Sequence, residues 1–361
     1  MSTVVAVVLL AAVAAYAVFG GADFGAGFWD LTAGGPERGA APRELIERSI
    51  GPVWEANHVW LIFILVVTWT AFPTVYQSIW LTLFVPLTLA ALGIVLRGAS
   101  FAFRKSVTAP WFRRAFGGGF AIASVLVPFC FGAVAGGIAS GEVPSGGKAG
   151  DPVDSWLNPT SLVTGALAVA VVAYLAAVYL VREARRGGEV ALEGYFRRRA
   201  IAAAVVAGVL SGAGLVVVRS QARSVFDGLT SQALPLVLAT VLCATIALVM
   251  LALRAARGAR ILAVLATAGV VVSWGVAQWP YLLPGSVKVE DAAAPSGTLG
   301  ALLVAVVLAV VLVVPGFVLL FTLAERRLLP EEGAPDAADP VRPASQSSAR
   351  GDVAPPPARG S

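Results

Sequence analysis

The sequence predicts an all-α polytopic membrane protein, and three observations carry this prediction. Of the 361 residues, 58% are hydrophobic and only 13% are charged, and the mean hydropathy is +0.83. Nine stretches are apolar enough, over the roughly 20 residues that a bilayer requires, to form transmembrane helices. Lys and Arg residues concentrate in alternate connections between these stretches. This composition excludes an ordinary soluble globular chain.

The nine predicted spans would form about two four-helix bundles plus one extra helix. In chain order they are residues 3–22, 53–72, 78–97, 117–138, 159–181, 199–217, 232–252, 260–280 and 299–322. The first span lacks a preceding basic segment, so we interpret it as a retained helix and not as a cleaved signal sequence. Cys130 and Cys243 fall inside the fourth and seventh spans, where a thiol packs as a small apolar group, and no disulfide or metal motif is indicated.

The distribution of positive charge predicts the orientation of the helices. Of the 26 Lys and Arg residues, 22 lie after spans one, three, five and seven or in the C-terminal tail. Positive residues favour the cytoplasmic side, which places the N-terminus outside and the C-terminus in the cytoplasm, as an odd number of spans requires. We expect residues 1–329 to form the membrane domain and the Pro- and Ala-rich residues 330–361 to form a disordered cytoplasmic tail.

The net charge of +5 follows from this bias, so it requires no nucleic-acid partner. The basic runs beside the spans, such as "YFRRRA", are typical of positions that meet anionic lipid headgroups.

The first span ends in "YAVFGGADFGAGFWDL", which combines glycines with a carboxylate. Gly21 and Gly25 are four residues apart and form a small-residue stripe on which a second helix can approach closely. Asp23 lies within this stripe, near the cytoplasmic end of the span. It either makes a local hydrogen bond close to the membrane interface or has a function, because carboxylates inside membrane helices are costly.

The second span begins with "SIGPVWEANHVWL" and carries three polar side chains. Glu55 lies in the first turn, where the helix dipole favours a negative charge. At about 100° per residue, Glu55 and His58 share one face, whereas Asn57 and Trp60 lie on roughly the opposite face. A carboxylate beside an imidazole could pass protons inward from the cytoplasm, although capping and packing explain the same residues.

The third span ends in "LRGASFAFRK", which brings Arg97 and Arg104 to the cytoplasmic side. Arg97 is a candidate counter-ion for Asp23 or Glu55, and the alternative is an arginine that extends to lipid phosphate. The chain has one histidine, two methionines, no Cys-x-x-Cys-His and no phosphate-binding glycine loop. We therefore expect no cofactor or metal to be bound by this chain alone, so a redox role needs a partner subunit.

Several motifs resemble, in order and spacing, subunit II of the cytochrome bd quinol oxidases, a family that includes cyanide-insensitive members. The segments are "GGADFGAGFWDL", "SIGPVWEANHVWLI", "FPTVY", "LRGASFAFR", "LNP" and "WPYLLPGS". They cover the first eight predicted spans, and residues 49–104 form the most specific part.

The resemblance implies a terminal oxidase of the bacterial plasma membrane that oxidises quinol and reduces dioxygen to water. It implies that subunit I carries the haems, which are haem b with haem d or haem b only, and that subunit II is a haem-free partner needed for assembly. A small single-helix subunit is a further candidate partner, besides membrane lipids. By the same resemblance, Glu55 belongs to a proton path from the cytoplasm and Trp60 lies near an oxygen-access channel. The positions of Asp23, Arg97 and Arg104 match an acidic residue and a positively charged turn of the family.

The sequence departs from the family pattern at two positions. Gly20 stands where a second acidic residue is common, which weakens any scheme with two carboxylates at the first span. His58 stands where Glu or Gln is common, so an imidazole would tune the proton path here.

Two other classes of protein fit part of the pattern. One is a stand-alone proton-coupled secondary transporter. Broken helices at matching places in the two halves of the chain would favour this class. We find no such pair in the sequence. The other is a membrane scaffold without chemistry of its own. If turnover depends on protonatable residues of this chain, that class is excluded.

Overall fold

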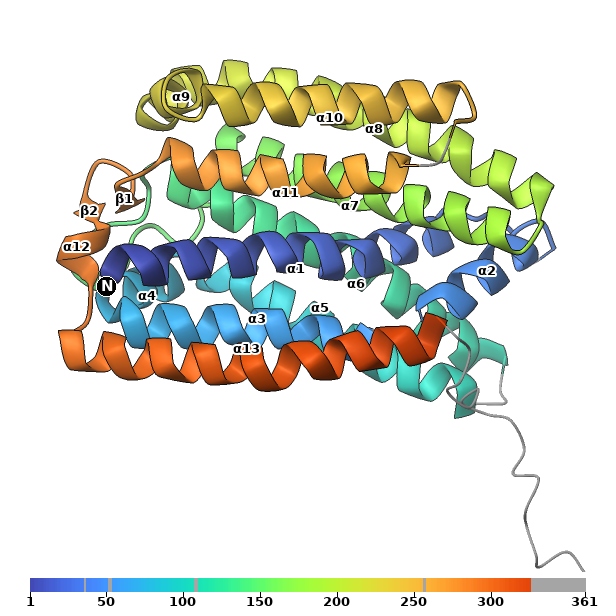
Figure 1. The fold of residues 1–361 in the computed structure, drawn as a ribbon, viewed down its shortest axis with the longest axis horizontal. Coiled ribbons are helices and arrows are strands. Elements are labelled where there is room, and N and C mark those ends of the chain that lie inside the picture. The colour runs from blue at the N-terminus through green and yellow to red at the C-terminus, as the bar shows by residue number, and fades with distance from the viewer. Residues whose placement is uncertain (36, 51–53, 107–109, 256–257, 326–361) are drawn as a thin grey trace, which may run out of the picture. The chain divides into compact units, whose positions relative to one another are not determined.

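A computed structural model of the chain describes residues 1–35, 37–50, 54–106, 110–255 and 258–325 (Figure 1). The chain divides into two compact units, Met1–Val314 and Pro315–Ser361. The predicted tail, residues 330–361, falls outside the described ranges. The helices and strands are α1 (Ser2–Leu31), α2 (Ala40–Ile50), α3 (Trp54–Ala71), α4 (Pro73–Thr82), α5 (Phe84–Ser106), α6 (Pro110–Ala139), α7 (Pro159–Arg186), α8 (Val190–Gln221), α9 (Arg223–Thr230), α10 (Leu234–Ala252), α11 (Ala259–Ala277), β1 (Tyr281–Leu283), β2 (Val287–Lys288), α12 (Val289–Ala292) and α13 (Ser296–Glu325).

The secondary structure confirms an all-α membrane protein. In the described part of the chain, the only sheet is an antiparallel pair formed by β1 and β2. Seven described helices are long and apolar enough to cross a membrane, or eight if α3 and α4, which meet at a bend of 119°, form one span. The apolar part of α5, Phe84–Ser100, is shorter than these. The nine predicted spans therefore correspond to seven candidate spans, the bent pair α3 and α4, and one shorter apolar helix.

The predicted boundaries of the second and third spans are partly wrong, because the chain bends twice there. Phe72 separates α3 from α4 with φ −134° and ψ 60°, and Pro73 begins α4. Leu83, between α4 and α5, interrupts the stretch 78–97 that we expected to be one helix. Proline suits a first helical position because its missing N–H would have no partner there. A similar break follows α8, where Ala222 has φ −132° and ψ 56° before α9 begins.

Helix α1 lies at the centre of the helix packing. It contacts α3, α6, α7 and α11, while α5 packs on α6, α7 on α8, and α10 on α11 (Figure 1). One apolar cluster around α1 contains Tyr16, Phe24, Val127 and Val172 as buried members. Polar side chains in the second half of α1 are therefore surrounded by other helices.

Candidate functional site

The second half of α1 packs closely against α7 because glycines stand at the contact points. A Cβ atom added at Gly25 would overlap the main-chain carbonyl group of Val172 and lie 2.7 Å from the Cβ atom of Ala176. A Cβ atom at Gly21 would lie 3.1 Å from a methyl group of Val172. This confirms the predicted small-residue stripe and identifies α7 as the helix that approaches it. The stripe carries Asp23, which lies between the two glycines in the chain, into the interior.

Replacing Gly25 by Ala is expected to destabilise the protein by at least the 1–3 kcal/mol that is typical of overpacking, because α1 and α7 must separate. The measurement is the thermal midpoint of the detergent-solubilised protein, followed by size-exclusion chromatography. Gly208→Ala is the matched control, since nothing in the described structure lies within 4 Å of a Cβ atom at Gly208 in α8. If the two variants melt alike, the close approach of α1 to α7 is not what constrains Gly25.

Asp23 connects three helices through hydrogen bonds. Asn57 Nδ2, near the start of α3, donates to Asp23 Oδ2. Arg97 Nη2, in the second half of α5, donates to the main-chain carbonyl oxygen of Asp23 at 2.8 Å. Asp23 is 4% exposed, Asn57 is 5% exposed and Arg97 is 2% exposed. The partners of Asp23 thus lie 34 and 74 residues away in the chain, which excludes the alternative of a merely local hydrogen bond.

Arg97 is enclosed by aromatic rings. Its guanidinium carbon lies 4.6 Å from the ring centroid of Phe24 and 4.9 Å from that of Phe120. Such contacts stabilise a cation by about 0.5–2 kcal/mol each. Arg97 therefore lies next to Asp23, although the hydrogen bond reaches the main-chain oxygen and not the carboxylate. Its role as a counter-ion stays a prediction. The alternative prediction, an arginine extended to lipid phosphate, is wrong because the side chain is buried.

Other buried polar atoms belong to the residues around this site. Among the described residues, Arg97 Nε and Nη1, Ser100 Oγ and Tyr16 Oη have no hydrogen-bond partner. Ser100 lies on α5 about one turn after Arg97, and Tyr16 lies on α1 about two turns before Asp23. Buried polar atoms in proteins are nearly always hydrogen bonded to protein or to ordered water. The site therefore has the donors and acceptors that ordered water molecules need.

Three residues near the start of α3 face α1. Besides the hydrogen bond of Asn57, the His58 ring makes edge contacts with Tyr16 and Phe24, at centroid distances of 6.3 and 6.1 Å. Trp60 stacks on Phe19 at 6.3 Å. The predicted division of α3 into a polar face with His58 and a packing face with Asn57 is wrong. These adjacent residues lie on either side of the line along which α3 touches α1, so both reach it.

The structure does not describe two of the predicted side chains. Glu55 is in the first turn of α3, and Arg104 is near the end of α5, but both side chains lie outside the described part. Sequence reasoning missed the role of Asn57. The available signal was an amide in an otherwise apolar helix, at the end that we predicted to be cytoplasmic and where Asp23 was also expected.

Among the described residues, His58, Met250 and the two cysteines do not form one cluster. His58 packs against Tyr16 and Phe24, whereas Met250 packs against a different cluster, formed mainly by α7 and α8 with residues of α1, α2, α10 and α11. Cys130 and Cys243 are free thiols on different helices. Over the described ranges, no three His, Cys, Asp or Glu side chains lie close enough to hold a metal ion.

Known proteins with recognisable similarity to this chain include two curated relatives and one solved structure. Cytochrome bd-I ubiquinol oxidase subunit 2 of Escherichia coli K12 is 27% identical over 177 residues, which are 46% of this chain and 44% of that protein. Cytochrome bd ubiquinol oxidase subunit 2 of Bacillus subtilis 168 is 33% identical over 87 residues, or 24% of this chain and 25% of that protein. These alignments therefore span less than half of either relative. A solved structure of bd oxidase from Geobacillus thermodenitrificans has the same fold, with a TM-score of 0.70 and 23% identity over 89% of this chain and 98% of that one.

A family comparison covers nearly the entire membrane part of the chain. Residues 1–324, which include all the elements of the site, match the model of the family described as cytochrome bd terminal oxidase subunit II. The chain therefore belongs to the cytochrome bd terminal oxidase subunit II family.

Proposed function

We propose that this chain is the haem-free subunit II of a quinol:oxygen oxidoreductase in the bacterial plasma membrane. A partner subunit I would hold haem b with haem d, or haem b only, and would oxidise quinol and reduce dioxygen to water. The observation that carries the proposal is the buried Asp23–Asn57–Arg97 cluster, which places charged groups inside a helix bundle of this family. Intramembrane ionisable groups are costly and usually functional.

The cluster would be part of a proton path from the cytoplasm toward the haems. Glu55 and His58 would receive protons at the start of α3, and Asp23 would pass them on. Asn57 would orient the Asp23 carboxylate, and Arg97 would supply the compensating positive charge. The unpartnered hydroxyl groups of the residues around the site, described above, support this path because ordered water bound to them can relay protons.

Trp60 would border the route by which oxygen enters. The stacked pair of Phe19 and Trp60 forms an aromatic surface between α1 and α3. The Phe19 side chain is 39% exposed, so this aromatic surface is accessible from outside the helix bundle.

The proposed topology has nine spans, with the N-terminus outside and the C-terminus in the cytoplasm. Two four-helix bundles and one extra helix would result. The first bundle would contain α1, α3 with α4, α5 and α6, the second α7, α8 with α9, α10 and α11, and the extra helix would be α13. The matching breaks at Phe72 and Ala222 support this arrangement, because each follows the second long helix of its bundle. The membrane domain would end at residue 329, followed by the cytoplasmic tail 330–361.

A tagged version of the chain, purified in mild detergent from native membranes, tests the proposed function. We expect a larger polypeptide to co-purify and the reduced-minus-oxidised spectrum to show b-type bands, with or without a haem d band. A colourless chain that crosslinks to no partner in membranes would overturn the proposal.

The matching breaks also bear on the alternative of a proton-coupled secondary transporter. Transporters of that kind place broken helices near the middle of the membrane, with charged or polar groups at the break. Here Phe72 and Ala222 are buried and apolar, and each break follows the end of a long helix. Asp23 instead contacts Asn57, about four turns before the break at Phe72. The break at Ala222 lies between Gln221 and Arg223, however, so the breaks alone do not separate the two classes. The match of residues 1–324 to the subunit II family favours the oxidase subunit over the transporter.

Replacing His58 by Gln is expected to shift the pH profile of oxidase activity, because glutamine cannot bind a proton in the range where an imidazole titrates. The measurement is quinol-dependent oxygen consumption between about pH 5 and pH 9. Phe63→Leu is the control, since Phe63 lies on the same helix, packs against a separate apolar cluster and carries no titrating group. A profile unchanged by His58→Gln would show that the imidazole only packs.

A further inference from the structure

Three consecutive arginines near the start of α8 have different surroundings. Arg197 Nη1 donates to the carbonyl oxygens of Leu251 and Ala252, both at 3.3 Å, and so caps the end of α10. Arg198 is exposed. The guanidinium carbon of Arg199 lies 3.4 Å from the ring centroid of Tyr195, one turn earlier, and 5.8 Å from that of the buried Trp29 on α1. Arg199 is thus held flat on an aromatic ring, with its edge available to another group.

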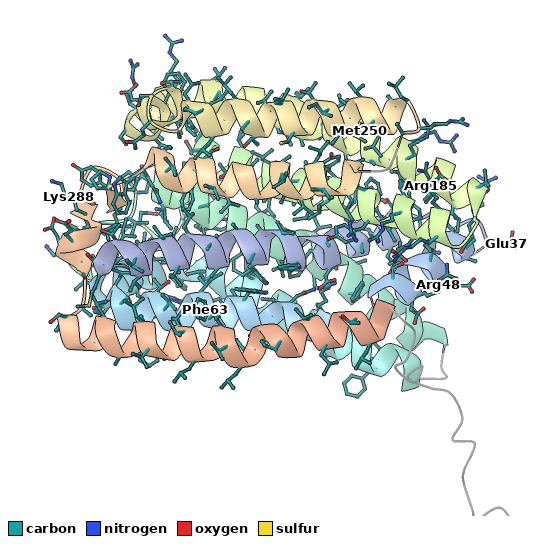
Figure 2. The ribbon with its side chains drawn as sticks, viewed as in Figure 1. Glu37, Arg48, Phe63, Arg185, Met250 and Lys288 are labelled. Carbon is teal, nitrogen blue, oxygen red and sulfur yellow. The ribbon has the colours of Figure 1, made fainter. Side chains whose placement is uncertain are left out.

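The carboxylates at this end of α7 and α8 already have cations. Glu189 pairs with Arg48 at 2.6 Å, and Glu193 pairs with Arg185 at 2.5 Å. Figure 2 labels Arg48 and Arg185 at this end of the first unit, and Lys288 at the other. Within the described part, no ion pair or hydrogen bond involves Arg199.

The hydroxyl group of Tyr195 is also buried without a hydrogen-bond partner among the described residues. That hydroxyl group is enclosed, so the partly exposed guanidinium of Arg199 provides the donors that an anionic oxygen group needs.

The surface of α8 beyond the arginines is apolar. Val206, Val209 and Val216 are 51%, 66% and 71% exposed. At about 100° per residue, these valines fall on the helix face between the directions of Arg198 and Arg199. Helical side chains lean toward the N-terminus, as the contact of Arg199 with Tyr195 also indicates, so the arginines extend away from the valines. An amphiphile with an anionic head and apolar chains fits this face, whereas a free phosphate would leave the valines uncovered.

We propose that Arg199, stacked on Tyr195 and assisted by Arg198, binds the phosphate group of an anionic phospholipid whose acyl chains lie along the valines of α8. The guanidinium edge donates two parallel hydrogen bonds to phosphate oxygens. The inference depends on the position of α8 in a membrane and not on the proposed oxidase function.

Native mass spectrometry of the purified protein, with its associated polypeptides, tests this site. Membranes containing phosphatidylglycerol, cardiolipin and phosphatidylethanolamine supply the lipids. We expect Arg199→Gln to reduce retained phosphatidylglycerol and cardiolipin about fivefold, the effect of one arginine at a lipid surface, and to leave phosphatidylethanolamine unchanged. Arg223→Gln is the control, because Arg223 is exposed, lies beyond the other end of α8, and pairs with Asp227 at 3.2 Å. It should retain lipid like the unmodified protein.

Three results would overturn the proposal. The first is equal retention of anionic lipid by Arg199→Gln and by the unmodified protein. The second is displacement of the lipid by millimolar inorganic phosphate, which would indicate a free-anion site. The third is a crosslink from position 206 to another polypeptide, which would show that a protein covers the valines. If Arg199→Gln fails to assemble, the exposed Arg198→Gln replaces it, and unchanged retention in that variant overturns the proposal equally.

Discussion

Replacing Arg97 by Met is expected to cause a large loss of stability, of about 3 kcal/mol, and to lower the yield of assembled protein. Methionine is similar in length, but it removes a buried positive charge next to Asp23 together with the contacts to Phe24 and Phe120. Removing one member of a buried charged pair typically costs about 3–5 kcal/mol, because the remaining charge is left without compensation. The measurement is the thermal midpoint and yield of the detergent-solubilised protein.

Two further variants separate charge from packing in this experiment. Arg223→Met is the control for loss of an exposed, paired arginine, and we expect it to change the midpoint little. The double variant Arg97→Met with Asp23→Asn removes both charges. It should recover part of the stability lost by Arg97→Met, since no uncompensated carboxylate remains. If the double variant loses the sum of the two single losses, Arg97 and Asp23 do not interact, and Arg97 acts only through the aromatic rings.

The sequence predicted the parts of this site that depend on one helix. The hydropathy of each segment predicted the long helices, and the spacing of Gly21 and Gly25 predicted a close helix contact around Asp23. Positive charge near the end of the third span predicted that Arg97 would be at the same end as Asp23, and the structure confirms that they touch.

The breaks in the helices were harder to predict, because hydropathy does not register a change of direction. At Phe72 the following Pro73 was a usable signal, since proline favours a first helical position and restricts the residue before it. At Ala222 neither proline nor glycine follows, so nothing local marks the end of α8. The similar backbone angles at the two breaks became visible only in the structure.

The partner of Asp23 could not be predicted from helical spacing. Spacing assigns residues to faces of one helix, but it does not say how wide a sector of that helix its neighbour contacts. Asn57 and His58, about 100° apart, both reach α1 because α1 lies between them. The contact of Arg97 with the Phe120 ring depends on how α6 packs against α5. No pattern in the sequence shows that these two helices meet at this position.

Replacing Asp23 by Asn is expected to lower turnover by at least about tenfold while the protein still assembles. Asparagine has nearly the same shape, so its side-chain oxygen can still accept from Asn57 Nδ2, and the bond from Arg97 to the main-chain oxygen remains. The variant loses only the group that can bind and release a proton. The measurements are quinol-dependent oxygen consumption and haem content per mole of chain.

The outcome distinguishes a proton carrier from a structural link between helices. Normal turnover in Asp23→Asn would contradict a role in the proton path and leave Asp23 with the task of joining α1 to α3 and α5. Glu55→Gln provides the comparison: we expect slow oxygen reduction with normal haem content, and lost haem would instead indicate a role in assembly. If Asp23 and Glu55 serve one proton path, the double variant should be about as slow as the slower single variant. Once one substitution has blocked proton transfer along the path, a second substitution on the same path lowers turnover little further. Multiplied effects would place the two carboxylates on separate paths.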